Sequence, residues 1–393
     1  METTNLQTSE RIYGLDALRS IMMLLGIVIH GSLAYLATNY NLWPLRDSVN
    51  SILFDLTSGF IHSFRMPIFF VVSGFFCALL LYKKGPNTML VNRFKRIVLP
   101  LLAFTLLIDP LEAFVFAYSG AKLIHTPSPV RVGWEAVMAG KFLPFYLGHL
   151  WFLYFLALYA VIAWLLIQAA QKAETYTITV RKLSSTVLQR FWLRTLCLGA
   201  LYFLCLYWQQ SPYLLTSFGW IVTPSVFITY LLFFGLGWII YTTNSLSKLA
   251  YYPIFQVSAA TFLFLAQCII QWPLTPTALA LKIALSALYT PLFVFGFLAF
   301  FLTYFNQYSA RLSYLMDASY WVYIIHLPVI AFIVGLLFDY PLSAFLKFTI
   351  TFSATSIICL VSYHYLVRGT FIGLFLNGKV HKQKKITPEK VVA

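Results

Sequence analysis

Charged side chains are scarce in this sequence. Only 10% of its 393 residues are Asp, Glu, Lys or Arg, whereas a soluble globular protein carries about 25%. Hydrophobic residues make up 60% of the chain and aromatic residues 18%, and the mean hydropathy is +0.80. So few charges cannot cover a water-facing surface, and so apolar a chain is neither disordered nor a basic nucleic-acid-binding domain. The composition predicts an integral membrane protein.

Cysteine and acidic residues are also few. The five cysteines lie inside apolar stretches, with neither a CxxC pair nor the spacing of metal ligands. A disulfide-stapled secreted module is therefore excluded, no metal site or bound cofactor is predicted, and the thiols are expected to pack as small hydrophobic groups. The 12 acidic residues stand against 27 Lys and Arg, which gives a formal charge of +15.

Ten runs of mainly apolar residues approach the length of about 20 residues that a helix needs to cross a bilayer. We therefore expect an all-α integral membrane protein, a single bundle of about ten transmembrane helices over residues 15–367. A short segment (1–14) precedes it, and a basic, disordered tail (368–393) follows and lies on anionic lipid. The expected spans are 15–38, 60–82, 97–118, 149–170, 192–208, 220–241, 252–271, 281–303, 318–338 and 345–367.

The distribution of cations orients this bundle. If the N-terminus is cytoplasmic, 19 of the 27 Lys and Arg fall on the cytoplasmic side and four lie within spans or at their ends. Only four fall on the opposite side: Arg46, Lys122, Arg131 and Lys141. Cytoplasmic loops carry the excess of positive charge in membrane proteins. The pattern predicts that both termini are cytoplasmic, which requires an even number of spans.

Ionisable residues at membrane depth are costly and by default mark function. In the first span Arg19 and His30 are eleven residues apart, which places them on one face of the helix and about 16 Å apart along its axis. Arg19 is expected near the cytoplasmic interface, with Asp16 three residues earlier as a candidate partner. His30 is expected past the midplane.

Three further spans are predicted to bring polar groups to the depth of His30. The second span runs in the opposite direction and enters from the outer face, so its polar residues lie near that face. The residues concerned are His62 and Arg65 in the second span, Glu112 in the third, and His149 at the start of the fourth. We expect a polar layer in the outer third of the bilayer. The inner face below it is marked by Arg19, Arg93 and Arg96.

Some of these residues also have purely structural interpretations. Arg93 and Arg96 could be anchors of the positive-inside type. His149, together with Trp151, could belong to a belt of amphipathic rings at the membrane interface. The layering of several residues therefore favours function more than any single residue does.

The remaining polar residues leave the same choice open. His326, in the middle of the ninth span, could be a hydrogen-bonded packing residue. Asp109 and Glu112 could simply pair with Arg65. Sequence alone does not decide between these interpretations and a chemical role.

Four motifs resemble those of the membrane-bound acyltransferase family 3. LDALRSIMMLLGIVIH has the family's Arg and His separated by ten residues, here Arg19 and His30. MPIFFVVSGFF is similar to the FFxxSGF signature, with Ser73 and Gly74, and RFKRIVLP is similar to the RxxRI-to-Pro motif. ASYWVYIIHLPV resembles the late Tyr-x-x-His-x-Pro helix and contains His326. The motifs occur in order, and ten spans fit the family fold.

The resemblance implies an acyl donor, and the predicted positions of the polar residues suggest a role for each. The donor is acyl-CoA, either succinyl-CoA or acetyl-CoA, and guanidinium groups at the cytoplasmic face bind its phosphates. His30 acts as general base on an acceptor hydroxyl, or forms an acyl-histidine, and Arg65 steadies an acyl carboxylate or the oxyanion. From their positions we expect donor binding by Arg19, Arg93 and Arg96, acceptor binding by His62, His149 and Trp151, and support from Glu112, Ser73 and His326. Asp109 and Glu112 are not part of the family motifs, so neither takes a family role.

Within the family, FIHSFRMPIFFVVSGFF, HLWFL and LFLNGK are most similar to the branch that succinylates periplasmic glucans in Gram-negative bacteria. This implies a multi-pass protein of the bacterial inner membrane whose partners are acyl-CoA, a periplasmic glucan or other glycan, and membrane lipid, with no nucleic acid. Two alternatives remain. One is an acetyltransferase of a surface polysaccharide or lipid-linked sugar; the other is a transporter or flippase, which the lack of internal repeats weakens.

Overall fold

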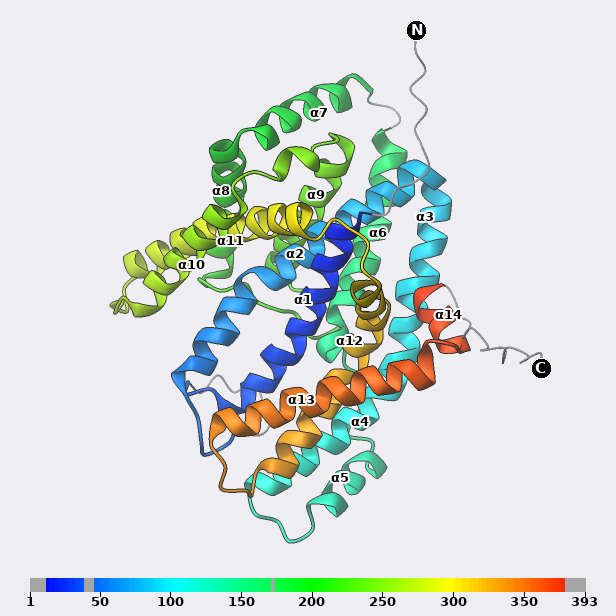
Figure 1. Ribbon diagram of the computed structural model, residues 1–393, viewed down its shortest axis with the longest axis vertical. Helices are drawn as coiled ribbons and strands as arrows, with labels where there is room; N and C mark the ends of the chain where they lie inside the picture. The colour runs from blue at the N-terminus through cyan, green and yellow to red at the C-terminus, as the bar shows by residue number, and fades with distance from the viewer. Residues whose placement is uncertain (1–11, 39–45, 171–173, 379–393) are drawn as a thin grey trace, which may run out of the picture.

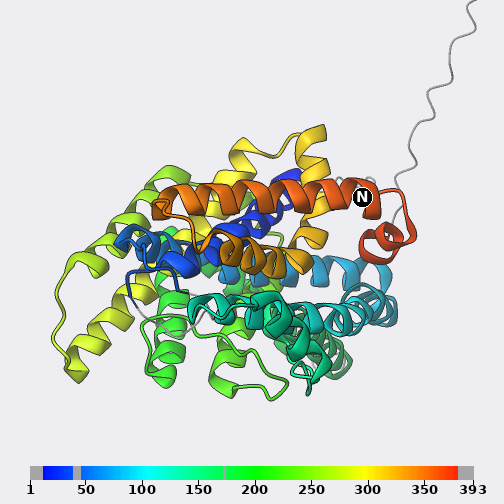
Figure 2. The same cartoon turned by 90° about the horizontal axis from the view of Figure 1, so that it is seen from below.

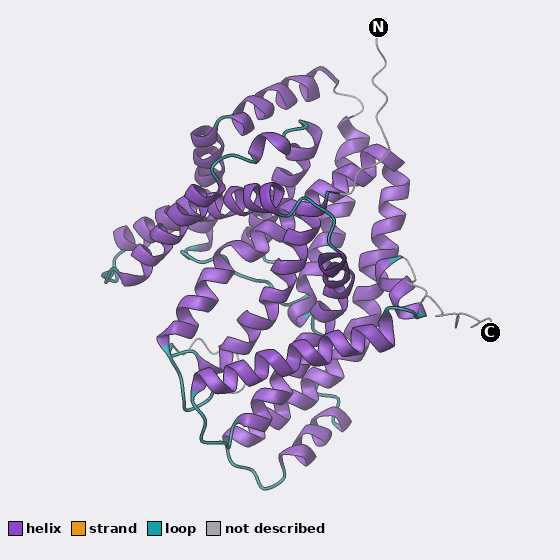
Figure 3. Cartoon of the chain, viewed as in Figure 1, coloured by secondary structure: helices purple, strands orange, loops and turns teal. Residues whose placement is uncertain are grey.

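The computed structural model describes residues 12–38, 46–170 and 174–378. Every named element in these ranges is a helix, and Figure 3 shows no strand among them. The α-helices are α1 (Tyr13–Ser32), α2 (Ile52–Lys84), α3 (Pro86–Arg93), α4 (Leu99–Leu123), α5 (Pro129–Met138), α6 (Trp151–Ala170), α7 (Glu174–Gln189), α8 (Phe191–Gln209), α9 (Pro224–Thr242), α10 (Pro253–Ile269), α11 (Pro276–Tyr304), α12 (Ala310–Leu337), α13 (Ala344–Ser362) and α14 (Phe371–Asn377). Short helical turns are η1 (Leu33–Tyr35), η2 (Phe94–Val98), η3 (Gly148–Leu150), η4 (Ser247–Leu249) and η5 (Tyr363–Val367).

The predicted all-α membrane bundle is confirmed. In the described part of the chain, nine helices are long and apolar enough to cross a bilayer. The seventh predicted span, 252–271, forms α10, which has 17 residues and is shorter than the other nine. A large difference from the predicted bounds concerns α2, which begins at Ile52 and not at residue 60. Residues 1–11 of the predicted N-terminal segment and 379–393 of the predicted tail lie outside the described residues.

Serine, threonine and proline mark where many helices begin. Side-chain oxygens accept a hydrogen bond from an N–H two or three residues further on at the start of α2, α11, α12, α13 and α14. The capping residues are Ser51, Thr275, Ser309, Ser343 and Thr370. Proline occupies the first turn of α3, α5, α9 and α10, where the missing N–H has no helical partner to lose.

Prolines inside the helices leave carbonyl groups without their helical donor. Pro67 of α2 cannot donate to the carbonyl of Ser63, because proline has no N–H. The hydroxyl of Thr290, on α11, donates to that carbonyl instead at 3.1 Å. Unpaired backbone groups are costly in a bilayer, so a side chain from a neighbouring helix supplies the donor that Pro67 lacks.

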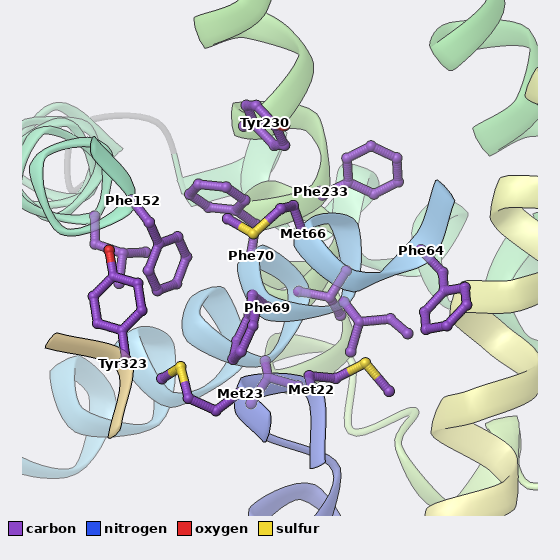
Figure 4. Packing of buried hydrophobic residues seen from close by; sticks show 14 of the residues in the cluster. Met22, Met23, Phe64, Met66, Phe69, Phe70, Phe152, Tyr230, Phe233 and Tyr323 are labelled. Carbon is purple, nitrogen blue, oxygen red and sulfur yellow. The ribbon is translucent and has the colours of Figure 1, made fainter. Parts of the chain in front are cut away.

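The helices α2 and α9 approach each other closely at two glycines. A Cβ added to Gly74 would lie 1.9 Å from the carbonyl oxygen of Phe234, and one added to Gly237 would lie 1.8 Å from that of Val71. Small residues allow transmembrane helices to pack in this way. Aromatic rings fill the space around the contact, with Phe70 4.7 Å from Tyr230 between ring centroids (Figure 4).

The first helix lies in the middle of the bundle. It packs against α2, α11, α12 and α13, and Figure 1 shows it between α2 and the α12–α13 pair. Figure 2, turned by 90°, shows α13 lying over α1 and α12. Because α12 also packs against α4, polar residues of α1, α4 and α12 can meet inside the protein.

Two basic residues are buried by contacts that the sequence did not indicate. Arg194, expected on the cytoplasmic side, is 2% exposed in α8, and its guanidinium carbon lies 4.9 Å from the ring centroid of Phe295. Lys347 of α13 is equally buried, and its ammonium group lies 2.7 Å from the carboxylate of Asp47. Both cations are compensated inside the fold, by a ring face and by a carboxylate respectively.

The beginning of the predicted disordered tail is a helix. Residues Phe371–Asn377 form α14, whose carbonyl groups at Leu374 and Phe375 accept hydrogen bonds from the Arg96 guanidinium at 2.5 and 3.0 Å. The side-chain amide of Asn377 donates to the Asp317 carbonyl at 2.8 Å. The expectation of disorder is therefore wrong for this segment, because Arg96 and α12 hold it in place.

Candidate active site

Three histidines from three elements meet inside the bundle. The rings of His30 on α1 and His326 on α12 lie 5.1 Å apart between centroids. The ring of His149, in η3, lies 5.4 Å from that of His326 and almost perpendicular to it, at 89°. His30 and His149, which were predicted to lie in the polar layer, therefore form one continuous group with His326, which was predicted to support the site.

His149 has a hydrogen-bond acceptor at each ring nitrogen. Nδ1 lies 2.9 Å from Oε1 of Glu112, and Nε2 lies 3.0 Å from the carbonyl oxygen of Ile324. A carbonyl cannot donate, so Nε2 carries a hydrogen, and a second hydrogen lies between Nδ1 and the carboxyl group. His149 is 7% exposed and joins α4 to α12, so it is not a residue of an interfacial belt.

The acceptor at Nε2 of His149 exists because of Pro328. In α12 the carbonyl of Ile324 would normally bond to the N–H four residues later, but that residue is Pro328. The imidazole of His149 takes the place of the missing donor. The contact is reinforced from the other side, because the hydroxyl of Tyr323 donates to the carbonyl of His149 at 2.6 Å.

His326 is anchored through one nitrogen only. Its Nδ1 lies 2.8 Å from the carbonyl oxygen of Tyr323 and 3.1 Å from that of Val322, so Nδ1 carries the hydrogen. The neutral ring then has its lone pair on Nε2, which is buried and has no hydrogen-bond partner in the described part of the chain. The packing interpretation of His326 accounts for Nδ1 and leaves Nε2 unexplained.

Arg65 lies deeper than the sequence predicted. Its Nε donates to the carbonyl of Met22 at 2.9 Å, about two turns nearer the start of α1 than His30. The prediction that Arg65 and His30 share one level is therefore wrong. Because α2 begins eight residues earlier than expected, Arg65 is 13 residues into the helix, about 20 Å from its first residue.

The two candidate carboxylates are engaged elsewhere. Asp109 accepts a hydrogen bond from the backbone N–H of Tyr146 at 2.8 Å, and Glu112 bonds to His149. Neither forms an ion pair with Arg65, and no other carboxylate of the described residues does. Arg65 is 6% exposed, and its buried guanidinium donates to a backbone carbonyl and lies 5.6 Å from the ring centroid of Phe69.

A recess at Gly26 brings Arg65 and His326 together. A Cβ added to Gly26 would lie 2.6 Å from Nη2 of Arg65 and 3.4 Å from Nε2 of His326. The two nitrogens therefore lie no more than 6.0 Å apart, the sum of those distances. This recess, which we call the Gly26 recess, is one helical turn from His30 and joins an unpaired cation to an unpaired ring nitrogen.

The three arginines predicted to bind the donor occupy different settings. Arg19 is partly exposed, 3.7 Å from Asp16, with its guanidinium carbon 5.9 Å from the ring centroid of Phe76. Arg93 ends α3, and its Nε is buried without a hydrogen-bond partner among the described residues. Arg96 has one nitrogen committed to the carbonyl groups of α14. Their role in donor binding stays a prediction.

Three other predicted residues form no hydrogen bond with His149 or His326 in the described part of the chain. His62 lies 2.6 Å, through Nε2, from the carbonyl oxygen of Leu214 in the α8–α9 loop. Trp151 is 5% exposed and packs between Tyr230 and other aromatic rings, so its indole is not accessible to a sugar in this conformation. Ser73 is half-buried on α2. The acceptor-binding and supporting roles of these residues are untested predictions.

Sequence reasoning missed two residues of the site. Gly26 lies one turn before His30 in the first motif, and Tyr323 lies three residues before His326 in the late motif. A glycine on the polar face of a buried helix and a tyrosine one turn from a membrane histidine were the available signals. Neither signal says which partner approaches, because that depends on how the helices rotate against one another.

A multi-pass helical bundle with histidines and an unpaired arginine at membrane depth belongs among enzymes and transporters rather than purely structural proteins. Comparison with known proteins decides between these classes. The acyltransferase domain family matches residues 12–364, so this chain belongs to that family and is a membrane acyltransferase.

Related proteins cover nearly the whole chain. Proteins named glucans biosynthesis protein C from Escherichia coli strains SMS-3-5, K12 and O157:H7 are each 26% identical to it over 384 residues. The match covers 94% of this chain and 95% of each relative. No solved structure is significantly similar to the chain.

Proposed function

We propose that this protein is a transmembrane O-acyltransferase that moves an acyl group, with succinyl as first candidate, from cytoplasmic acyl-CoA to hydroxyl groups of a periplasmic glucan. One observation carries the proposal: Arg65 holds a buried positive charge beside His326, one turn from His30, and no carboxylate of the described residues neutralises it. A buried cation needs an anionic partner. Acyl transfer supplies one, either the oxyanion of the tetrahedral intermediate or a carboxylate on the acyl group.

The donor enters from the end of α1 that carries Arg19. Guanidinium groups favour the bidentate binding of phosphate, and Arg19, Arg93 and Arg96 supply them for the CoA end. The pantetheine arm then extends beside α1 towards His30. The eleven residues from Arg19 to His30 correspond to a rise of about 16 Å, which an extended arm of this kind spans.

His30 acts as general base on the acceptor. A neutral imidazole accepts a proton near neutral pH. As it removes the proton of the sugar hydroxyl, the hydroxyl oxygen attacks the thioester carbonyl, the new C–O bond forms and the C–S bond breaks. An alternative in which His30 itself carries the acyl group requires the same residue at the same place.

The acceptor and the membrane follow from similarity and charge. The relatives are named for glucan biosynthesis, which supports a glucan as acceptor. The bias of cations towards one side supports cytoplasmic termini in a bacterial inner membrane. Acetyl transfer to a surface polysaccharide or lipid-linked sugar remains the second candidate, because Arg65 serves an oxyanion as well as a carboxylate.

Replacement of His30 by Ala tests the proposal directly. In cells lacking the native gene, we expect the variant to lose anionic substitution of periplasmic glucan, with the rate of transfer falling on the order of 10² to 10⁴-fold. His364→Ala is the matched control, since His364 lies in η5 beside Tyr314 and takes no part in the site. Normal substitution in the His30→Ala strain would show that the proposal is wrong.

The choice of acyl group is tested with purified protein and the two labelled donors, succinyl-CoA and acetyl-CoA. If Arg65 binds the succinyl carboxylate, Arg65→Met should lower transfer of succinyl more than transfer of acetyl. If Arg65 stabilises the oxyanion, both should fall together. Wild-type protein that turns over neither donor would show that the acyl group is neither succinyl nor acetyl.

A further inference from the structure

His326 stands out as a buried group whose chemistry the proposed function has not used. We propose that His326 is a second catalytic residue, which receives the proton taken up by His30 and delivers it to the sulfur of the departing CoA. This inference rests on the proposed function and adds to it the path of the proton, from His30 through His326 to the CoA sulfur. His149 and Glu112 are the residues that position it.

The first support is the tautomer of His326. Its Nδ1 is fixed as a donor by the carbonyl groups of Tyr323 and Val322, at 2.8 and 3.1 Å. The lone pair is therefore on Nε2, the nitrogen that faces the Gly26 recess without a hydrogen-bond partner among the described residues. A nitrogen held in this way accepts and returns a proton without rearrangement of the ring.

The second support is the place of His326 along α1. The ring of His326 lies 5.1 Å from that of His30 between centroids, so a proton passes between them directly or through one water. Its Nε2 lies beside Gly26, four residues and about 6 Å nearer the Arg19 end of the helix than His30. His30 is thus on the acceptor side and His326 on the donor side.

Both His30 and His326 take part in the proton balance of the reaction. The sugar hydroxyl gives its proton to His30 as its oxygen bonds to the acyl carbon. His30 passes that proton to Nε2 of His326, and the sulfur takes it from His326 as the C–S bond breaks. The products are the ester and CoA thiol, both histidines return to their starting state, and Arg65 faces the anionic carbonyl oxygen throughout.

His149 is placed to position His326 and not to carry the proton. Both of its ring nitrogens are engaged, with Glu112 and with the carbonyl of Ile324, so neither is open to substrate. Its ring packs at 89° against the ring of His326, with centroids 5.4 Å apart. The bond to Ile324 also fixes the turn of α12 that carries His326.

The test compares two donors that differ in their need for a proton. CoA thiolate is a basic leaving group, whereas the thiolate of an aromatic thiol leaves without protonation. For His326→Gln we expect kcat/KM with the acyl-CoA to fall on the order of 10²-fold, and with an aryl thioester of the same acyl group to fall far less. His364→Gln, which removes a histidine away from the site, should leave both values unchanged.

The outcomes separate this inference from the proposed function. Equal losses with both donors, or no loss with acyl-CoA, would overturn the role of His326 while leaving that of His30 intact. Full activity of His30→Ala would overturn the proposed function itself. Poor folding does not confuse the result, because the ratio of the two donors is taken within each variant and the amount of folded protein cancels. His149→Phe should lower kcat with acyl-CoA far more than with the aryl thioester and leave KM for acyl-CoA unchanged; normal kcat with acyl-CoA would remove its positioning role.

Discussion

At the scale of single residues, the site depends on Gly26 having no side chain. Gly26 lies within a regular helix, so its value is space and not backbone freedom. A Cβ at this position would lie 2.6 Å from Nη2 of Arg65, a separation that real Cβ atoms do not show. Arg65 cannot move far in response, because its Nε is bonded to the Met22 carbonyl. The glycine therefore allows the guanidinium to approach α1.

We predict that Gly26→Ala lowers activity without lowering stability by a comparable amount. Alanine favours a helix over glycine by about 1 kcal/mol, which offsets part of the crowding, whereas a displaced guanidinium no longer meets the acyl group. Turnover with acyl-CoA should fall on the order of tenfold or more, and the thermal unfolding midpoint should change little. Gly235→Ala in α9 is the matched control, since no atom lies within 4 Å of a Cβ there. Equal turnover of the two variants would contradict the role given to Gly26.

The sequence predicted the members of the polar group better than their contacts. Helical spacing and the alternation of spans suffice to bring His30, Glu112 and His149 to similar depths. The level of Arg65 could not be read, because Asp55, Thr57 and Ser58 make the start of α2 look like a loop. The partner of Glu112 could not be read either, since the choice between Arg65 and His149 depends on rotation of whole helices about their axes.

At the scale of helices, each internal proline leaves a carbonyl group without its helical donor. The side chains that donate to these carbonyl groups bring polar residues of different helices together. Pro67 frees the Ser63 carbonyl for Thr290, and Pro328 frees the Ile324 carbonyl for His149. A sequence indicates which carbonyl each proline releases, four residues earlier. It does not indicate the donor, because the donor comes from a helix distant in the sequence. The bond between His149 and the Ile324 carbonyl thus gives a structural reason for the proline two residues after His326.

We predict that substitutions at His149 and Pro328 are coupled in stability. His149→Phe leaves the Ile324 carbonyl unpaired, at a cost of about 1 to 3 kcal/mol. Pro328→Ala restores a backbone N–H to that carbonyl, so the cost of His149→Phe should be smaller in the Pro328→Ala background. The unfolding free energies of the four proteins in a double-mutant cycle measure this coupling. Strictly additive effects would mean that the His149–Ile324 bond contributes nothing.

The cycle also distinguishes stability from positioning. The contact of Glu112 with His149 is lost in both backgrounds, so its contribution cancels from the coupling. If His149 only satisfies the carbonyl, Pro328→Ala should recover the activity of His149→Phe together with its stability. If His149 also holds His326 in place, stability should recover and turnover should not. We expect the second result, because the ring contact between the two histidines is not replaced.

At the scale of the whole molecule, the charge of +15 has several different functions. Lys347 and Arg194 are compensated within the fold, by Asp47 and by an aromatic face. Arg96 joins α14 to the bundle. Most other cations fall on one predicted side and orient the chain. Arg65, like Arg194, is buried without a matching carboxylate among the described residues, but its guanidinium lies beside His326 and one turn from His30.

The orientation of the molecule depends on whether α10 crosses the membrane. With 17 residues it is about 25 Å long, slightly less than the hydrocarbon core. Its buried polar residue Gln267 accepts a hydrogen bond from Ser286 of α11 at 3.2 Å, while Phe262 and Ile269 are exposed. Polar groups turned inward and apolar groups turned outward are typical of a helix surrounded by lipid. Figure 1 shows α10 alongside α11.

We therefore predict that α10 crosses the membrane, which brings the number of spans to ten and places the C-terminus in the cytoplasm. In intact cells, a membrane-impermeant maleimide should label Leu274→Cys, in the loop after α10, and should label Lys248→Cys, before α10, only after the membrane is permeabilised. Both positions are exposed, so accessibility within the fold does not bias the comparison. Were α10 to return to the side from which it entered, Leu274→Cys would be protected in intact cells and Arg368 would lie outside. The positive-inside bias makes that arrangement unfavourable, because it moves Arg311 and the basic residues after Arg368 across the membrane as well.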